Sequence, residues 1–94
     1  MQLRWTAAAA DDLERIADYL FEKTPENAAQ LIRRIYDAPS ALKIFPNRGR
    51  QGKKQGTREL VIPSLPYIVV YRIAEDVVYV VRILHGAQDW PRKS

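Results

Sequence analysis

The sequence contains no cysteine and only one histidine, His85, among its 94 residues. Without cysteine, neither a disulfide framework nor a thiolate metal site can form. One histidine is too few for a cluster of histidine ligands, so we expect neither a metal nor a cofactor. No apolar run approaches the length that a bilayer requires. The N-terminus also lacks a basic stretch followed by an apolar core, so we expect a cytoplasmic protein without a secretory signal or a membrane partner.

Positive charge is unevenly distributed along the chain. Residues 1–26 hold six acids and three cations, whereas residues 27–94 hold twelve cations and five acids. Such a distribution favours an anionic partner, either a nucleic acid or an acidic protein. Five cations follow one another with no acid among them: Arg48, Arg50, Lys53, Lys54 and Arg58.

The first half of the chain predicts a strand followed by two helices. Residues 1–5 alternate between polar and apolar, which is the period of a half-buried strand. Thr6 is expected to be the N-cap of a first helix, and Thr24 followed by Pro25 is typical of the start of a second. Pro39 predicts a kink or a restart of the second helix, because proline cannot donate the backbone hydrogen bond. The two helices are expected to form an antiparallel hairpin.

After a basic loop at 46–56, the second half of the chain is rich in β-branched and aromatic residues, which predicts strands at 58–62, 67–73 and 77–84. The connections at 63–66 and 74–76 are short enough for hairpins. The sequence therefore predicts one α+β domain over residues 1–94. Its order is β-α-α-β-β-β, with the helical hairpin packed on one face of a small, largely antiparallel sheet.

Four stretches, in this order, resemble the ParE/RelE superfamily of toxins of type II toxin–antitoxin systems. They are WT at 5–6 with DDL at 11–13, FPNRGR at 45–50, GTREL at 56–60 leading to PYIVVYR at 66–72, and RILHGAQDW at 82–90. The resemblance spans nearly the whole chain and implies a RelE-like fold. It also implies a toxin neutralised by a cognate antitoxin, whose disordered segment folds as it wraps the toxin.

The resemblance implies one of two targets. ParE-like members poison DNA gyrase, whereas RelE-like members cut messenger RNA in the ribosomal A site. The RNA-cutting members carry an arginine just after the residue that opens the central strand, and this chain has Ile68 after Tyr67. The tail after His85 also lacks a tyrosine. These departures favour the ParE-like branch and DNA gyrase, with a ribosome-dependent endoribonuclease as the alternative.

The alternative requires catalytic groups. Metal-free cleavage of RNA needs an acid and a base, together with cations that stabilise the charged phosphate. His85 is the only side chain whose ordinary pKa lies near neutrality, so the nuclease hypothesis makes it the acid or base. Arg58 and Arg82 would bind the phosphate. The simpler interpretation is that His85 ends the last strand and bonds to neighbouring backbone.

Candidate binding residues for a target or an antitoxin include the four cations of the basic loop, with three further arginines and a tryptophan. Arg72 and Arg82 lie within apolar strands, either presenting charge on the sheet face without helices or pairing across strands with Glu59, Glu75 or Asp76. Trp90 follows the last strand and either folds back on the domain or belongs to a target-binding tail. The full set is Arg48, Arg50, Lys53, Lys54, Arg58, Arg72, Arg82 and Trp90.

Two further expectations concern the helices. The acids of the first helix, Asp11, Asp12, Glu14 and Asp18, are predicted to form a solvated face. The helical hairpin and an exposed sheet edge are predicted to leave a groove that suits an amphipathic helix or an added strand of the antitoxin.

Overall fold

The computed structural model describes residues 1–86 and 90–91. Its elements confirm the predicted order, with a short 3-10 helix (η1) and one additional strand (β2) between the second helix and the hairpin strands. The elements are β1 Gln2–Trp5, α1 Ala7–Lys23, α2 Pro25–Asp37, η1 Ala38–Lys43, β2 Arg50–Gln51, β3 Arg58–Val61, β4 Tyr67–Ala74 and β5 Val77–His85.

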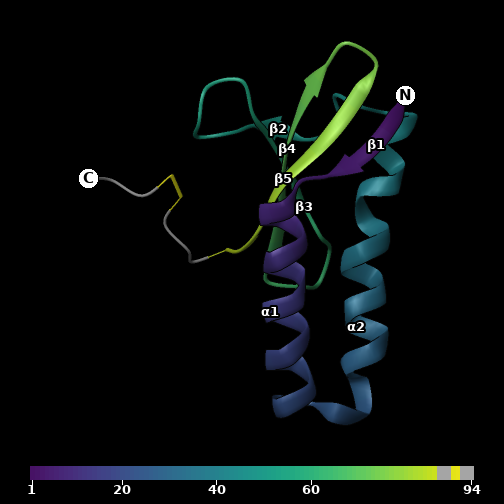
Figure 1. Cartoon of the computed structure of the whole chain (residues 1–94), viewed down its shortest axis with the longest axis vertical. Coiled ribbons are helices and arrows are strands. Elements are labelled where there is room, and N and C mark those ends of the chain that lie inside the picture. Colours follow the sequence, from purple (N-terminus) through teal and green to yellow (C-terminus); the bar gives the residue numbers. More distant parts are fainter. Residues whose placement is uncertain (87–89, 92–94) are drawn as a thin grey trace.

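The ends of the helices follow from local sequence signals. The hydroxyl of Thr6 accepts a hydrogen bond from the backbone amide of Ala9, which satisfies one of the free donors at the start of α1. Pro25 occupies the first turn of α2, where a missing N–H costs nothing. The chain continues beyond Asp37 as η1, with Pro39 near its start, as the proline predicted. Figure 1 shows α1 and α2 as an antiparallel pair.

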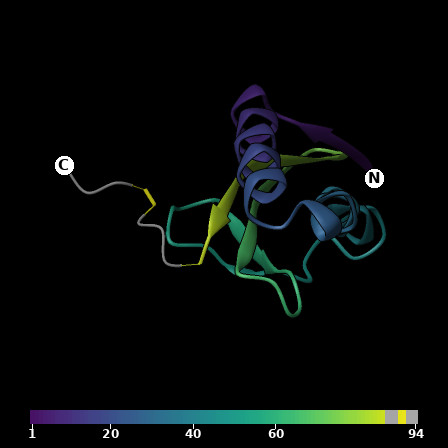
Figure 2. The same cartoon turned by 90° about the horizontal axis from the view of Figure 1, so that it is seen from below.

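The sheet has the strand order β1-β5-β4-β3-β2. β1 pairs with β5 in parallel, and every other neighbouring pair is antiparallel. Both helices lie on one side of this sheet (Figure 2), which is the predicted layer arrangement. We call the opposite side of β3, β4 and β5 the open face.

The core fills the space between the helices and the sheet. Ala28 and Ile35 of α2 are fully buried against Val69 and Val80 of the central strands. Since neighbouring residues of a strand point to opposite faces, Glu59, Ile68, Val70 and Leu84 lie on the open face.

Side chains from the start of α1 occupy the outer edge of β5 where β1 has ended. The last pair between the two strands is Trp5 with Val80. Beyond it, the Thr6 hydroxyl donates to the carbonyls of Val80 and Val81 at 3.0 and 3.1 Å. The Asp12 carboxylate accepts the amide of Ile83 at 2.9 Å. Polar groups that a neighbouring strand would otherwise bind are therefore satisfied by α1.

Two predictions need correction. Asp12 is only 4% exposed and does not belong to a solvated face, because its carboxylate binds β5. Asp11, Glu14 and Asp18 are exposed as predicted. The basic loop contains β2, whose two residues were not expected to pair with β3. No helix in the described part of the chain is long and apolar enough to cross a membrane.

Candidate functional site

The basic loop is fixed to the sheet by Tyr71 of β4. The Tyr71 side chain is fully buried, and its hydroxyl donates to the carbonyl of Pro46 at 2.6 Å. The same hydroxyl accepts the amide of Gly49 at 2.9 Å. A side chain at position 49 would clash, because a Cβ there would lie 2.7 Å from the Tyr71 ring and 2.8 Å from the carbonyl oxygen of Glu59. The glycine therefore permits this close approach of loop and strand.

Arg58 also holds this loop. One of its terminal nitrogens donates to the carbonyl of Gly49 at 2.9 Å and to that of Asn47 at 3.4 Å. The side chain is half-buried. Arg58 therefore fixes the backbone of its own chain, which leaves fewer of its donors for a phosphate.

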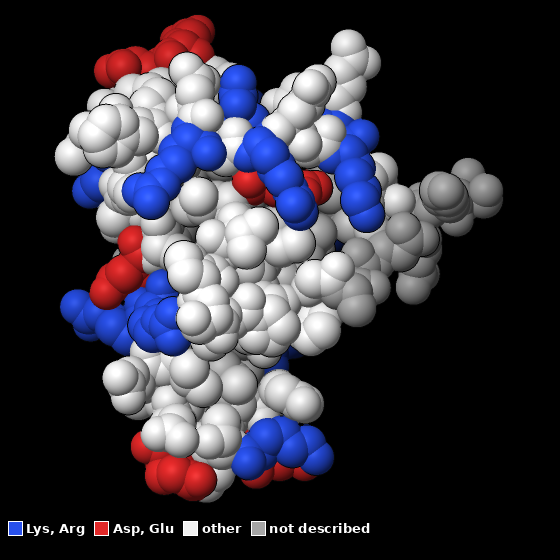
Figure 3. All heavy atoms as spheres, turned by 180° about the vertical axis from the view of Figure 1, so that it is seen from behind, with Lys and Arg blue, Asp and Glu red and all other residues white. Residues whose placement is uncertain are grey.

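The positive charge of the loop is partly compensated by Glu59, the residue that follows the run of cations. Glu59 is 7% exposed, and its carboxylate lies 3.0 Å from a terminal nitrogen of Arg50. It also accepts the Lys53 amide at 3.5 Å. Viewed from behind, basic side chains gather in the upper part of the molecule with acidic atoms between them (Figure 3). Arg48, Lys53 and Lys54 remain exposed.

Glu59 and His85 line the same small pocket on the open face. His85 is the last residue of β5 and packs edge-on against the Tyr67 ring, with 5.9 Å between ring centroids. The pocket has a volume of about 50 Å³. It is lined by Arg50, Lys53, Glu59, Ile68, Leu84, His85, Gly86 and Trp90. Neither Arg58 nor Arg82 is among the lining residues, so the structure does not bring the three proposed catalytic residues together there.

Trp90 lies over the basic loop. It is half-buried, and the ammonium nitrogen of Lys54 lies 5.7 Å from the centre of its ring. Such a distance permits a cation–π interaction. The sequence left two positions open for Trp90, one folded back on the domain and one in a target-binding tail. In the structure Trp90 is folded back on the domain. Residues 87–89 and 92–94 lie outside the described residues.

Arg82 is not paired with any of the three acids that the sequence suggested. Its guanidinium binds the Asp12 carboxylate through two hydrogen bonds, of 2.7 and 3.0 Å. The hydrogen bond with Asp12 raises the pKa of Arg82 above its ordinary value. Asp12 also accepts a hydrogen bond from Arg15 at 2.7 Å. The expected partners were all strand or turn residues, and the actual partner comes from a helix 70 positions earlier.

Arg72 lies over a neighbouring aromatic ring. The carbon at the centre of its guanidinium lies 4.4 Å from the centroid of Tyr79, its cross-strand partner. Arg72 is exposed at this position. Its charge is therefore available to a partner, with a cation–π contact that holds the side chain in place.

An apolar groove separates the helical hairpin from the β3–β4 turn. Its volume is about 410 Å³. The helices contribute Arg15, Ile16, Tyr19, Leu20 and Leu31, and the sheet side contributes Leu65, Pro66, Tyr67 and His85. Among the described residues there is no cluster of three or more metal-binding side chains.

The comparison with known proteins decides the family. Residues 3–90 match the family described as the ParE toxin of the type II toxin–antitoxin system parDE. The chain belongs to the ParE toxin family. It is 40% identical over 91 residues to the protein Y4kP of Sinorhizobium fredii, covering 97% of this chain and 94% of that protein. It is also 37% identical over 87 residues to Toxin RelE2 of Caulobacter vibrioides, covering 93% and 97%.

Solved structures of toxin–antitoxin systems have the same fold as this ParE-family chain. A chain of the chromosomal ParDE system of P. aeruginosa superposes with a TM-score of 0.84 at 27% identity, covering 90% of this chain and 95% of that chain. A chain of the RelBE2 toxin–antitoxin complex of Mycobacterium tuberculosis gives a TM-score of 0.60 at 24% identity, covering 93% and 92%. The RelE-like fold expected from the sequence is therefore confirmed.

Sequence reasoning named the two buried acids that organise these surfaces but gave them other roles. The pairing of Glu59 with Arg50 could have been found from their opposite positions, but only if the two-residue strand β2 had been recognised. The burial of Asp12 could not be read from its neighbours, since Asp11 and Glu14 on the same helix are exposed.

Proposed function

We propose that this toxin inhibits bacterial growth in the cytoplasm by binding and poisoning DNA gyrase, and that a cognate antitoxin neutralises it. One observation carries the choice of a binding toxin over a nuclease. The two arginines that a nuclease would use on phosphate are engaged within the chain, Arg58 by loop carbonyls and Arg82 by Asp12. Gyrase itself is inferred from the resemblance to the ParE-like branch and from Ile68 at the position after Tyr67.

A ribosome-dependent endoribonuclease is the second candidate, and one observation favours it. His85 and Glu59 line one pocket together with Arg50. An imidazole and a carboxylate could supply an acid and a base, and Arg50 could stabilise phosphate charge. Against this candidate, Arg50 already pairs with Glu59 at 3.0 Å, so phosphate would compete with an existing ion pair.

Growth arrest after induction of the toxin alone distinguishes the two candidates. DNA and protein synthesis are followed together by pulse labelling in a sensitive bacterium. Gyrase poisoning predicts that DNA synthesis stops first, with double-strand breaks and a DNA-damage response. A nuclease predicts that protein synthesis stops first and that messages are cut.

The variant His85→Ala adds a second criterion. A gyrase poison is expected to remain toxic with this substitution, because the histidine then has no chemical role. Loss of toxicity in a variant that still folds would instead support the nuclease candidate. Folding is measured by circular dichroism and not by antitoxin binding, because His85 also lines the groove proposed for the antitoxin.

The antitoxin is proposed to bind as an amphipathic helix in the apolar groove between the hairpin and the β3–β4 turn. An added strand is less favoured, because Thr6 and Asp12 already bind polar groups at the edge of β5. The opposite edge, β2, is only two residues long. The groove has an apolar lining and one cation on its rim, Arg15, which suits a helix with an apolar stripe and an acidic flank.

This antitoxin site is tested with a pair of exposed aromatic residues on α1. Tyr19 is 55% exposed and lines the groove, whereas Phe21 is 53% exposed on the outer side of the hairpin. Tyr19→Asp is expected to weaken binding of the co-expressed neighbouring gene product about ten-fold or more. Phe21→Asp is expected to have little effect. The reverse result would place the antitoxin on the outer side of the hairpin, and failure of any neighbouring product to bind would contradict the antitoxin proposal itself.

A further inference from the structure

The junction between η1 and the basic loop exposes two large apolar side chains side by side. Ile44 is 74% exposed and Phe45 is 60% exposed, the highest values among the large hydrophobic residues described. They line a shallow surface pocket of about 590 Å³ together with Pro46, Asn47 and Arg48. Single exposed apolar residues are common on proteins, but two adjacent ones beside a pocket indicate a contact surface.

The backbone beneath these side chains is held in one conformation. The amide of Phe45 donates to the carbonyl of Ala41 at 2.9 Å, and the amide of Arg48 donates to the carbonyl of Phe45 at 3.1 Å. The buried Tyr71 hydroxyl binds the Pro46 carbonyl. A preorganised surface loses little conformational freedom on binding, so its apolar contacts contribute more fully to affinity.

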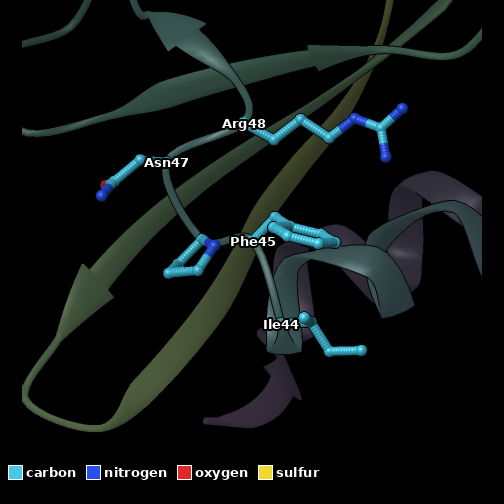
Figure 4. Close-up of a pocket in the computed structure, with 5 residues that line it drawn as sticks. Ile44, Phe45, Asn47 and Arg48 are labelled. Carbon is cyan, nitrogen blue, oxygen red and sulfur yellow. The ribbon is translucent and has the colours of Figure 1, made fainter.

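The charge around the pocket is positive. No Asp or Glu occurs in the sequence between Asp37 and Glu59, and Glu59 is paired with Arg50. Arg48 is the charged member of the lining. Figure 4 shows the side chains of Phe45 and Arg48 extending in the same direction, whereas that of Asn47 points to the other side. An apolar group that packs on Phe45 would therefore bring an adjoining carboxylate within reach of Arg48.

This chemistry fits a protein better than a nucleic acid. Nucleic acids are bound by a track of several cations along the phosphates, often with aromatic rings on which bases stack. This pocket has one lining cation, and its most exposed apolar side chain is the aliphatic Ile44, which offers no stacking surface. Apolar anchors with an arginine at their edge are typical of protein–protein contacts.

We propose that Ile44, Phe45 and Arg48 form a docking surface for an acidic segment of the toxin's target protein, one that carries an apolar side chain beside a carboxylate. The proposal rests on the proposed function, since it takes the target to be a protein. It is separate from the antitoxin site, because the two pockets share no lining residue. Arg48 meets the carboxylate, and Ile44 with Phe45 buries the apolar anchor.

Two variants test the apolar and the charged part of this surface. The double variant Ile44→Ser, Phe45→Ser removes the apolar part, and Arg48→Glu reverses the charge. The matched controls are Val61→Ser, an aliphatic side chain 48% exposed in β3, and Lys23→Glu, an exposed cation at the end of α1. All changes are on exposed side chains, so folding is expected to be retained and is checked by circular dichroism.

Binding of the full-length toxin to purified DNA gyrase and to the co-expressed antitoxin is measured for each variant, together with growth inhibition. Both test variants are expected to bind gyrase about ten-fold more weakly or worse and to lose toxicity in proportion. Antitoxin affinity is expected to stay within about three-fold of wild type, and the controls should match wild type in every measurement.

Three outcomes would overturn the proposal in distinguishable ways. Wild-type gyrase binding in both variants would mean that the surface is not used. Equal loss of gyrase and antitoxin binding in a folded variant would assign the surface to the antitoxin. A wild-type toxin that binds no gyrase and does not arrest growth would contradict the proposed function, and this inference with it. If the double variant fails to fold, Arg48→Glu alone decides.

Discussion

Asp12 of α1 and Arg82 of β5 form a two-point ion pair that joins the helical hairpin to the sheet. Nε of Arg82 lies 2.7 Å from Oδ2 of Asp12, and Nη2 lies 3.0 Å from Oδ1. The same carboxylate accepts the Ile83 amide at 2.9 Å. Because Asp12 is only 4% exposed, these hydrogen bonds replace the water that the charge has lost. The pair therefore belongs to the framework of the fold, whatever the target.

Replacing Asp12 with asparagine is expected to lower the free energy of unfolding by about 2–4 kcal/mol. The amide keeps the size of the side chain, but it removes the negative charge and puts an NH2 group in place of one carboxylate oxygen. Arg82 would then lose its charged partner, and one of the donors bonded to Asp12 would face another donor. Urea unfolding followed by circular dichroism measures the change.

The control for this substitution is Asp11→Asn, one position earlier on an exposed part of the same helix. It is expected to change stability by less than about 0.5 kcal/mol. Equal effects at the two positions would mean that the ion pair contributes no more than a surface charge.

Substituting Gly49 with alanine is expected to destabilise the protein by about 2–3 kcal/mol. The added methyl group would lie 2.7 Å from the Tyr71 ring and its hydroxyl, and 2.8 Å from the Glu59 carbonyl oxygen. The buried ring and the strand backbone have little room to move.

Thermal unfolding of Gly49→Ala is compared with that of Gly86→Ala. At position 86 the nearest neighbour of the new atom is the Pro66 carbonyl oxygen, at an ordinary 3.6 Å. A melting temperature near that of wild type for Gly49→Ala would mean that the loop can be displaced from the strand at little cost.

The fold could be predicted from the sequence because its elements carry local signals. The period of the apolar residues, Thr6 and Pro25 at helix starts, and Pro39 at the restart each act within a few positions. The resemblance to the ParE/RelE superfamily implied a fold that agrees with this predicted order of helices and strands.

The site was predicted less well because its contacts join residues far apart in the sequence. The sequence predicted that Arg82 could present its charge to a target, but in the fold it binds Asp12, 70 positions away in sequence. The nuclease hypothesis made Arg58 a phosphate ligand, but in the fold it donates to the carbonyls of Asn47 and Gly49. No local pattern specifies either partner. The partners of these two arginines can therefore be identified only from the tertiary structure.

Two threonines at helix starts are expected to differ in their contribution to stability. The Thr6 hydroxyl accepts the Ala9 amide and donates to carbonyls of β5, so Thr6→Ala is expected to cost about 1–2 kcal/mol. Thr24 makes no side-chain capping bond to the backbone of α2, and Thr24→Ala is expected to cost less than about 0.5 kcal/mol. Urea unfolding of both variants measures the difference. Similar losses at the two positions would count against the role given to the Thr6 hydroxyl at the edge of β5.

Tyr67 is expected to make stability depend on pH in the alkaline range. Burial raises the pKa of its hydroxyl above 10.0, with a smaller contribution from the neighbouring Tyr19. The folded protein therefore favours the neutral phenol, whereas the unfolded chain ionises near pH 10. Above that pH the unfolded state binds fewer protons than the folded state, so the free energy of unfolding falls as pH rises.

Urea unfolding from pH 8 to about pH 11 is expected to show a steeper fall in the free energy of unfolding for wild type than for Tyr67→Phe, which lacks the ionisable group. Tyr36→Phe, at a residue 54% exposed, serves as the control and should follow wild type. Parallel curves for wild type and Tyr67→Phe would show that burial of this phenol does not couple its ionisation to folding.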